Sequence, residues 1–330
     1  MLDIIIPTYK NKEGLRRTLS SIDFSLQPEI TITVIDDCSE MCYNDILEDY
    51  SGLQIFYLSK NSGPGNARQY GIEMTNQPYL TFIDTDDTFL NKNVFPTILN
   101  TIKENPNDVM FTWQYKIDNK ISKETNNRMH GRVYKREFID RYNISFCPEA
   151  SFTNEDIGFN RLCRMIIRDK NLPQKVFQDP IINYIKNENS ITNFNKGEFF
   201  FCQQNTGLSL NTIHTLNIAE KNNLSINIIL EELNSIMASL YYTFLCTAYE
   251  RPKFLQEAWK GARLFYYNAF LKYIEMNNSE IIMMYYAPFI KRIYRRAKKW
   301  KNFQTLNYTR FLQDLRKYEN PPMYYLFDNK

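Results

Sequence analysis

Short apolar runs alternate with amphipathic segments through residues 1–115 of the chain. The apolar runs predict strands in DIIIPTY, ITITVIDD, LQIFYL, PYLTFIDTDD and DVMFTWQY. Between the first two runs, EGLRRTLSSI places Leu15, Leu19 and Ile22 on one face of a helix. Strands that alternate with helices are typical of an α/β fold with a parallel sheet and crossover helices. We therefore expect this part of the chain to be built on such a sheet.

Three of these strand-like runs end in polar residues. The first ends at Pro7 and is followed by Thr8, the second ends at Asp36 and Asp37, and the fourth ends at Asp84. In open α/β sheets, ligands bind in the crevice beyond the carboxyl ends of the strands. The sequence therefore predicts a ligand site at this edge of the sheet.

The pattern changes beyond these strands. Residues 116–195 mix a polar excursion or hairpin, two helices and returning strands, and helical periodicity dominates from Phe199 to Tyr318. The sequence shows no internal repeat and no low-complexity tract. We expect two domains, one at 1–196 that contains the sheet and a mostly α-helical one at 197–330.

The composition is that of a soluble globular protein. Of the 330 residues, 43% are apolar and 23% are charged, and Tyr and Phe number 23 each, which suits large cores and sugar- or base-stacking surfaces. The opening MLDIIIPTYK is not a secretory leader, and the apolar stretch 236–249 is shorter than the ~18 residues of a membrane span. The six scattered cysteines are interpreted as reduced thiols. Together these features predict a cytoplasmic location.

The fourth predicted strand leads into three carboxylates, Asp84, Asp86 and Asp87. Like charges this close repel each other, so a positive partner is expected. One interpretation is a site for Mn²⁺ or Mg²⁺ that is shared with ligand phosphates, because hard cations bind oxygen. The alternative is an acidic cap for a helix in NKNVFPTIL. An EF-hand is excluded, because Phe89 occupies the sixth loop position, where glycine is required.

Two further segments carry candidate ligand-binding groups. Asp36 and Asp37 are either caps for a helix at 43–50 or acceptors for a base N–H or a ribose hydroxyl. The loop NSGPGNAR resembles a phosphate loop, but it has neither the G-K-[ST] ending nor the G-x-G-x-x-G spacing. Its Arg68 is expected to pair with a phosphate or with a carboxylate.

The segment TNEDIGF places Glu155 and Asp156 in the first turn of a predicted helix, with Asn154 as its cap. The helix dipole is expected to keep both carboxylates ionised. A general base acting on a hydroxyl needs that charge. Ordinary first-turn acids remain the alternative when this segment is taken by itself.

Together these segments resemble the family 2 glycosyltransferases. The resemblance rests on IIIPTYK, VIDDCS, NSGPGNARQYGIEMTNQPYLTFIDTDD, HGRVYKREFI, NEDIGF and NYIKNENSIT, which follow one another in the family's order over residues 2–193. It implies a GT-A fold, a Rossmann-like mixed sheet flanked by helices. It also divides the first domain into a nucleotide-sugar-binding part at 1–115 and an acceptor and base region at 116–196.

The resemblance also implies roles for individual residues. Glu155 and Asp156 match the catalytic carboxylates, with Asp156 as the general base. Asp84 and Asp86 match the D-x-D element that holds the metal and the diphosphate, and Asp87, which follows it, is added as a third metal ligand. Residues that contact the nucleotide-sugar donor are expected at Pro7, Thr8, Tyr9, Asp36, Asp37, Asn61, Gly63, Arg68, Asp84, Thr85, Asp86 and Lys186.

The chain departs from the family pattern at three positions. Gln69 stands where Asn is common, and His130 stands where an aromatic residue is frequent. Lys186 stands where Arg is common, which replaces a planar fork by a point charge. These departures put the fine geometry at the diphosphate in doubt, while the D-x-D block is intact.

The segment KRIYRRAKKWK, residues 291–301, has seven basic residues and no acid. Its apolar residues recur at helical spacing, so it predicts a basic amphipathic helix. Three interpretations stay open: a solvated surface helix, contact of 288–303 with an anionic acceptor or the inner membrane face, and nucleic-acid binding. The predicted helices at 224–249 and 254–273 are candidates for a homo-oligomer interface.

The function that these observations favour is an inverting glycosyltransferase in polysaccharide biosynthesis. It uses a UDP-sugar and Mn²⁺ or Mg²⁺, and its acceptor is the hydroxyl of a glycan, a lipid-linked saccharide or an anionic polymer. The metal neutralises charge on the departing diphosphate, while Asp156 takes the acceptor proton. The alternatives are a catalytically silent sugar-nucleotide or glycan-binding module and a glycosyltransferase that acts on nucleic acid.

Overall fold

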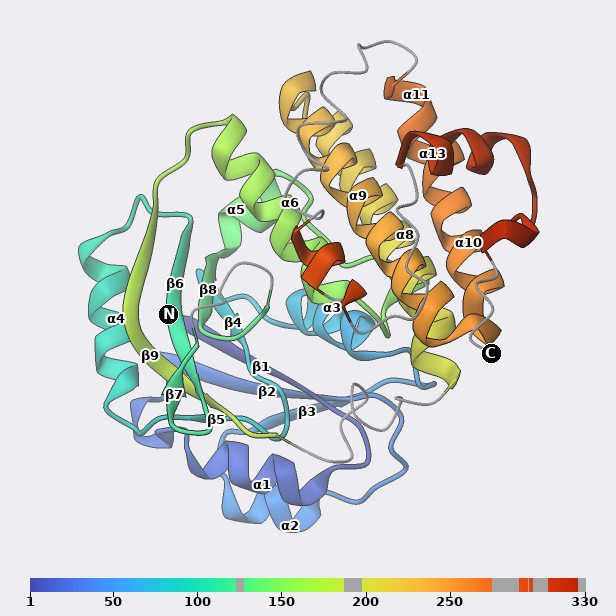
Figure 1. Cartoon of the computed structure of the whole chain (residues 1–330). Helices are drawn as coiled ribbons and strands as arrows, with labels where there is room; N and C mark the ends of the chain where they lie inside the picture. Colours follow the sequence, from blue (N-terminus) through green and yellow to red (C-terminus); the bar gives the residue numbers. More distant parts are fainter. Residues whose placement is uncertain (123–127, 187–197, 275–290, 296, 299–307, 326–330) are drawn as a thin grey trace. The chain divides into compact units, whose positions relative to one another are not determined.

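The computed structural model describes all residues except 123–127, 187–197, 275–290, 296, 299–307 and 326–330 (Figure 1). The chain divides into two compact units, Met1–Ser190 and Ile191–Lys330. The predicted boundary at 196–197 lies just outside the described residues. The functional division into 1–115 and 116–196 stays a prediction.

The first unit is built on one sheet with the strand order β3-β2-β1-β4-β8-β6-β9-β5, and β7 pairs with β6. Its first four strands are parallel to one another and form where apolar runs predict them: β1 (Leu2–Thr8), β2 (Ile30–Asp36), β3 (Gln54–Tyr57) and β4 (Tyr79–Phe82). β1 lies between β2 and β4, so the carboxyl ends of these three strands are neighbours.

The rest of the sheet is mixed. β8 runs antiparallel to both β4 and β6, whereas β9 runs parallel to β6 and antiparallel to β5. The bounds are β5 (Thr88–Phe89), β6 (Met110–Ile117), β7 (Lys120–Ile121), β8 (Arg132–Lys135) and β9 (Gln174–Tyr184). A wholly parallel sheet is therefore wrong beyond β4, and the mixed sheet implied by the family resemblance is confirmed.

Helices cover both faces of the sheet, with α1 and α2 below it and α3 and α6 above it in Figure 1. Side chains from α1, α2 and α4 share a buried apolar cluster with Ile4, Ile6 and Val34. Ile5 faces the other way, because a Cβ added at Gly71 of α3 would meet its side chain at 2.3 Å. The helices are α1 (Lys12–Ser20), α2 (Asn44–Asp49), α3 (Pro64–Met74), α4 (Val94–Glu104), α5 (Arg136–Arg141) and α6 (Glu155–Asp169), with 3₁₀ turns at Phe24–Leu26 and Pro148–Ala150.

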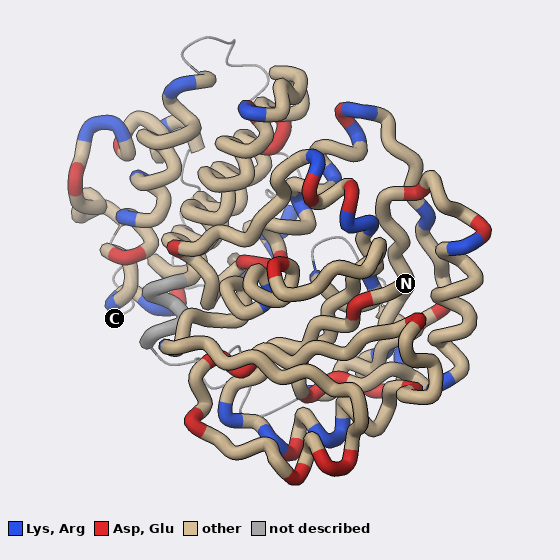
Figure 2. Tube along the Cα trace, turned by 180° about the vertical axis from the view of Figure 1, so that it is seen from behind, with Lys and Arg blue, Asp and Glu red and all other residues tan. Residues whose placement is uncertain are grey.

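Charges of opposite sign lie side by side on α1 and α2, at the foot of the first unit in Figure 2. Lys12 pairs with Asp45 at 2.6 Å and Arg16 with Asp49 at 2.6 Å. These charges compensate one another, so this side of the unit does not provide the one-sided positive surface that nucleic-acid binding requires.

The described part of the second unit is helical, as its periodicity predicts. Aromatic rings of Tyr241, Phe244, Trp259, Phe311 and Tyr325 pack together in its core. Its elements are α8 (Glu198–Lys221), α9 (Ile226–Glu250), a 3₁₀ turn at Pro252–Phe254, α10 (Leu255–Phe265), a π turn at Tyr266–Phe270, α11 (Leu271–Ile274), α13 (Tyr308–Lys317) and a 3₁₀ turn at Met323–Tyr325.

The apolar stretch 236–249 lies within α9, as predicted. Among the described helices, none combines the length and the apolar character needed to cross a membrane. Of the predicted basic helix, residues 291–295 are helical, with Ile293 and Ala297 buried and Lys291 and Arg295 exposed. The rest of 288–303 falls outside the described residues apart from 297–298, so its predicted contacts stay predictions.

Candidate active site

The carboxyl ends of β1, β2 and β4 meet at one edge of the sheet, as their polar endings predict. The Asp37 N–H donates to the Thr8 carbonyl at 2.8 Å, and the Ile83 N–H donates to the Ile5 carbonyl at 3.2 Å. The residues that follow β4 therefore lie beside the residues that follow β1 and β2. This edge brings most of the expected nucleotide-binding residues into one region.

Asp36 and Asp37 hold the loops of this edge. The Asp36 carboxylate accepts from the Ser39 N–H at 2.9 Å and from the Tyr43 hydroxyl at 2.8 Å. The Asp37 carboxylate accepts from the N–H groups of Ser62 and Gly63, each at 2.7 Å. Burial raises the pKa of Asp37 against the effect of these two donors. Contact of Asp36 and Asp37 with a base or a ribose stays a prediction. The alternative that these two residues cap α2 is wrong, because Tyr43 is the residue that directly precedes that helix.

The loop before α3 is fixed against the segment that leads into α6. Gly63 has φ +88°, and a Cβ there would meet the Ser151 hydroxyl at 2.6 Å, so glycine is required on both counts. The Asn66 side-chain amide donates to the Pro148 carbonyl at 3.2 Å and to the Ser151 hydroxyl at 3.1 Å. The loop is thereby tied to the segment that carries Glu155 and Asp156.

Arg68 joins the two predicted carboxylate blocks. The residue is 4% exposed, and its guanidinium pairs with Asp84 at 2.6 Å and with Glu155 at 3.0 Å. Burial opposes ionisation of Asp84, but Arg68 outweighs it and lowers the pKa of that carboxyl. Of the two alternatives for Arg68, the structure shows carboxylate pairing. The positive partner of Asp84 is therefore an arginine of the chain itself.

Glu155 and Asp156 begin α6, but their environment differs from the expectation. Burial, together with the neighbouring Asp156, raises the pKa of Glu155 to about 7 despite Arg68. Burial also raises the pKa of Asp156. Burial therefore opposes ionisation of both carboxyl groups, against the effect expected of the helix dipole. Asn154 has φ 60° and makes no side-chain capping hydrogen bond, so its predicted capping role is wrong.

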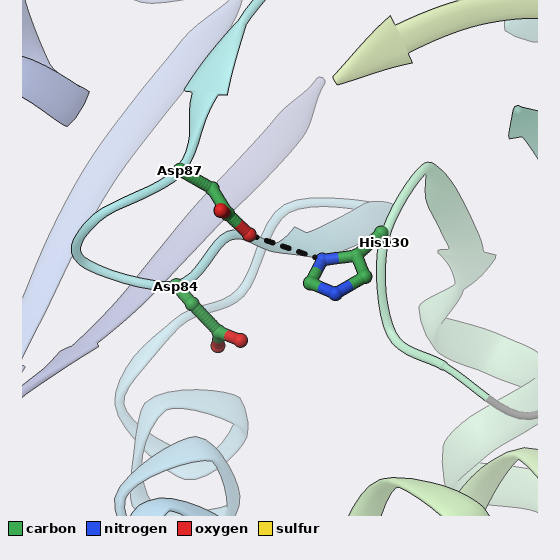
Figure 3. Close-up of side chains that lie close together, drawn as sticks. All are labelled: Asp84, Asp87 and His130. Carbon is green, nitrogen blue, oxygen red and sulfur yellow. Dashed lines mark ion pairs between the residues drawn. The ribbon is translucent and has the colours of Figure 1, made fainter. Parts of the chain in front are cut away.

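Asp84, Asp87 and His130 lie close together (Figure 3). Each offers one ligand atom, and these atoms all lie within 4.8 Å of one another. Asp87 is fully buried, with Oδ2 3.2 Å from His130 Nδ1 and Oδ1 accepting from the Ile185 N–H at 2.9 Å. The helix-cap alternative for this cluster is wrong, because α4 begins only at Val94.

The other predicted residues occupy different positions around the edge. Thr85 is buried and its hydroxyl donates to the Pro7 carbonyl, whereas Tyr9 is 44% exposed. Asp86 is half-buried in the turn after β4 and lies outside the group of ligand atoms formed by Asp84, Asp87 and His130. Exposed Lys186 pairs with Asp118.

Sequence reasoning missed His130 as a partner of Asp87. It noted this residue only as a departure from the family pattern. A usable signal was present, because the chain has two histidines and this one stands before a glycine in a block assigned to the site region. Gly131 has φ +69°, which marks a backbone bend at this position.

The raised pKa of Glu155 predicts a pH effect on stability. A carboxyl whose pKa rises on folding, here from 4.5 to about 7, stabilises the fold fully below the lower value and progressively less up to the higher one. The Glu155 contribution to the free energy of unfolding should therefore fall as pH rises through that window. Glu155→Gln should flatten the pH profile there, measured by urea unfolding at several pH values. Identical slopes in both proteins would contradict the assignment.

The architecture and the site define a class of protein: a GT-A-type mixed sheet with carboxylates at the carboxyl ends of its parallel strands. Solved structures support that fold. The crystal structure of S. aureus TarS 1–349 in complex with UDP has a TM-score of 0.54 at 16% identity, covering 93% of this chain and 94% of that chain. The crystal structure of S. aureus TarS has a TM-score of 0.56 at 19% identity, covering 93% of this chain and 57% of that chain.

The sequence comparisons identify the family. The model of glycosyl transferase family 2 matches residues 3–162, so this part of the chain is a family 2 glycosyltransferase domain. The putative teichuronic acid biosynthesis glycosyltransferase TuaG of Bacillus subtilis is 30% identical over 91 residues, 26% of this chain and 36% of TuaG. The poly(ribitol-phosphate) beta-N-acetylglucosaminyltransferase TarP of Staphylococcus aureus is 33% identical over 119 residues, 33% of this chain and 35% of TarP.

The name of a third relative indicates a lipid acceptor and not a polymer. The processive diacylglycerol beta-glycosyltransferase of Mycoplasma genitalium is 28% identical over 116 residues, 33% of this chain and 34% of that protein. The matches thus span about a third of these three curated relatives.

Proposed function

We propose that this chain transfers a sugar from a UDP-sugar to a hydroxyl of a cell-surface polymer, with inversion at the anomeric carbon. The observation that carries the proposal is the Arg68 bridge. It holds Asp84, after β4, and Glu155, at the start of α6, on one guanidinium at 2.6 and 3.0 Å. The donor block and the base block, 71 residues apart in sequence, therefore form one site.

The donor is proposed to lie along the carboxyl edge of β1, β2 and β4. Tyr9 offers an exposed ring there for the base, and Asp37 and the loop at 61–63 offer polar groups beside it. TarS, which shares the fold, has been crystallised with UDP-GlcNAc. That supports a UDP-sugar here, while the identity of the sugar remains for experiment.

The site also fits a divalent cation. Asp84, Asp87 and His130 converge, and Asp86 lies next to them in the chain. Bound Mn²⁺ or Mg²⁺ supplies positive charge for the diphosphate leaving group. The carboxylates would hold that cation, and Arg68 lies between Asp84 and Glu155, where it limits the repulsion between the two.

Asp156 is the better placed of the two carboxylates for the role of base. Glu155 is held by Arg68 and is 8% exposed, whereas Asp156 is half-buried and accepts from the Ile157 N–H at 2.7 Å through Oδ1. Its raised pKa moves it toward the range in which a carboxylate takes a proton efficiently. Asp156 takes the proton of the acceptor hydroxyl as that oxygen attacks, and a single displacement inverts the configuration.

The acceptor is proposed to be an anionic cell-wall polymer. The names of TuaG and TarP, with teichuronic acid and poly(ribitol-phosphate), support this class. The name of the Mycoplasma genitalium relative supports a lipid acceptor instead. A cytoplasmic site of action, contact of 288–303 with the inner membrane face and oligomer formation through the C-terminal helices are part of the same proposal.

The test is a panel of sugar nucleotides, each incubated with the full chain and Mn²⁺, with and without ribitol-phosphate polymer. We expect Mn²⁺-dependent release of UDP from one donor and faster release with the polymer. A catalytically silent binding module would bind the nucleotide and release no UDP from any donor. That outcome would overturn the proposal.

Asp86→Asn provides a specific test of the donor site. The change removes one negative charge and keeps the shape of the side chain. Affinity for UDP in the presence of Mn²⁺ should fall at least about tenfold, because the D-x-D carboxylate that the family resemblance assigns to the metal and the diphosphate loses its charge. Calorimetric titration measures this affinity. The control is Asp49→Asn, which removes a charge from an exposed surface ion pair and should leave the affinity for UDP unchanged. Wild-type affinity in Asp86→Asn would remove this residue from the site.

A further inference from the structure

We propose that His130 is a direct ligand of the divalent ion, together with Asp87 and Asp84, and that it makes this site prefer Mn²⁺ to Mg²⁺. The inference rests on the proposed function, because it concerns the same cation. It adds a nitrogen donor from a strand-end loop that the D-x-D block does not contain. It keeps Asp87, which the sequence already gives as a third metal ligand, and places the nitrogen donor beside it.

The spacing of the facing atoms supports a shared cation. Asp87 Oδ2 and His130 Nδ1 are 3.2 Å apart. Two ligands at right angles around an ion, each about 2.1–2.2 Å from it, lie roughly 3.0 Å from each other. The observed separation is therefore close to that of neighbouring ligands. Figure 3 shows Asp84 at the other end of the turn, and one of its oxygens lies within 4.8 Å of the ligand atoms of Asp87 and His130.

A second observation points to a ligand. Asp87 is 0% exposed, yet its Oδ2 has no aligned hydrogen-bond donor among the described residues. A buried carboxylate oxygen in that condition is costly. Its other oxygen accepts from the Ile185 N–H at 2.9 Å, which fixes the carboxylate with Oδ2 toward His130. A proton and a divalent ion are the two cations that fit between these atoms, and the proposal assigns the ion.

The imidazole is held in place by aromatic rings. The Tyr115 and Tyr184 rings lie 5.0 and 5.3 Å from the His130 ring, between centroids. His130 itself is 8% exposed, whereas the Asp84 side chain is 36% exposed and leaves a route for the ion from solvent. A ligand fixed in this way loses little conformational entropy when it binds.

Two positive groups near the cluster oppose a cation. Arg68 contacts Asp84 through Oδ1, but Glu155 shares its charge, and the second Asp84 oxygen remains as a donor atom. Arg128 lies 5.7 Å from the centre of the Tyr184 ring and weakly disfavours positive charge on His130. Against these stand Asp84 and Asp87, with Asp86 in the adjoining turn. The carboxylates therefore keep the cluster able to accept a divalent ion.

The nitrogen donor decides which ion is preferred. Mg²⁺ favours oxygen ligands, near-ideal octahedral geometry and retained water. Imidazole suits transition metals, and affinity rises from Mn²⁺ toward Co²⁺ and Zn²⁺ for a given set of ligands. A site with His130 as ligand should therefore bind Mn²⁺ more tightly than Mg²⁺, and the difference should shrink when the nitrogen is removed.

The experiment measures binding of Mn²⁺ alone and of Mg²⁺ alone to the full chain, without any sugar nucleotide. His130→Phe keeps an aromatic ring and His130→Asn keeps a polar group, and circular dichroism confirms folding of each. We expect both variants to lose at least tenfold in Mn²⁺ affinity and less in Mg²⁺ affinity. Altering the residues around metal ligands already costs about 10–100-fold in metal affinity, and His130 is proposed as a ligand itself.

Electron spin-echo spectroscopy of bound Mn²⁺ gives a second readout, because a coordinated imidazole nitrogen modulates the echo. The chain has two histidines, so His214→Asn is the matched control and should keep the signal that His130→Phe loses. Unchanged Mn²⁺ affinity in both His130 variants, or no nitrogen signal in the wild type, would overturn this inference. Sugar transfer in the wild type would still support the proposed function, whereas His130-dependent Mn²⁺ binding without transfer from any donor would contradict that function alone.

Discussion

Asp156→Asn should reduce the rate of sugar transfer by at least about 10²-fold, the lower end of the usual contribution of a general base. The amide keeps the size of the side chain but cannot take the proton of the acceptor hydroxyl. Affinity for the UDP-sugar should stay within about threefold, because the base acts on the acceptor and not on the nucleotide. Single-turnover transfer and calorimetric titration of UDP measure the two quantities separately.

Glu155→Gln is the matched control for this experiment. The amide oxygen of the substituted side chain can still accept from Arg68, which contacts Glu155 Oε1 at 3.0 Å in the wild type. Transfer should therefore fall much less than in Asp156→Asn. If the glutamine variant loses transfer and the asparagine variant does not, the base is Glu155, and its pKa of about 7 then becomes the catalytic one.

The sheet edge was predictable because its signal is local. Each of β1, β2 and β4 is a short apolar run that ends in polar residues, and parallel neighbours bring such ends together. The bridge at Arg68 was not predictable from such runs. It depends on α6 lying against α3, and that contact is made between segments some 87 residues apart.

The burial of the carboxylates at the start of α6 could not be predicted from the sequence either. A position in the first turn of a helix suggests a stabilised negative charge, yet Glu155 is buried against Gly65. A Cβ added at Gly65 would lie 3.0 Å from the Cβ of Glu155. Burial of this kind depends on tertiary packing, which no local pattern encodes. His130 is similar, because β8 and β9 flank β6 in the mixed part of the sheet, and this arrangement brings His130 near Tyr184 and Asp87.

Arg68→Met should have the largest effect on stability. The side chain is 5% exposed and balances Asp84 and Glu155, so its loss leaves two carboxylates facing each other. Breaking a buried ion pair from one side costs about 3–5 kcal/mol of unfolding free energy. The lower end is expected here, because the Asp84 side chain is 36% exposed and Glu155 has a raised pKa and can take up a proton. Hydrogen exchange of β4 amides measures this free energy for the first unit.

The same reasoning fixes the pH dependence and the control. Protonated Glu155 no longer repels Asp84, so the cost of Arg68→Met should be smaller at pH 5 than at pH 8, on either side of the Glu155 pKa of about 7. Arg16→Met is the matched surface variant, because Arg16 also pairs with two carboxylates, Asp45 and Asp49, but on exposed helices. Its cost should stay under about 1 kcal/mol. Equal costs for the two variants would mean that Arg68 acts as an ordinary surface charge and that the two carboxylate blocks are not held together by it.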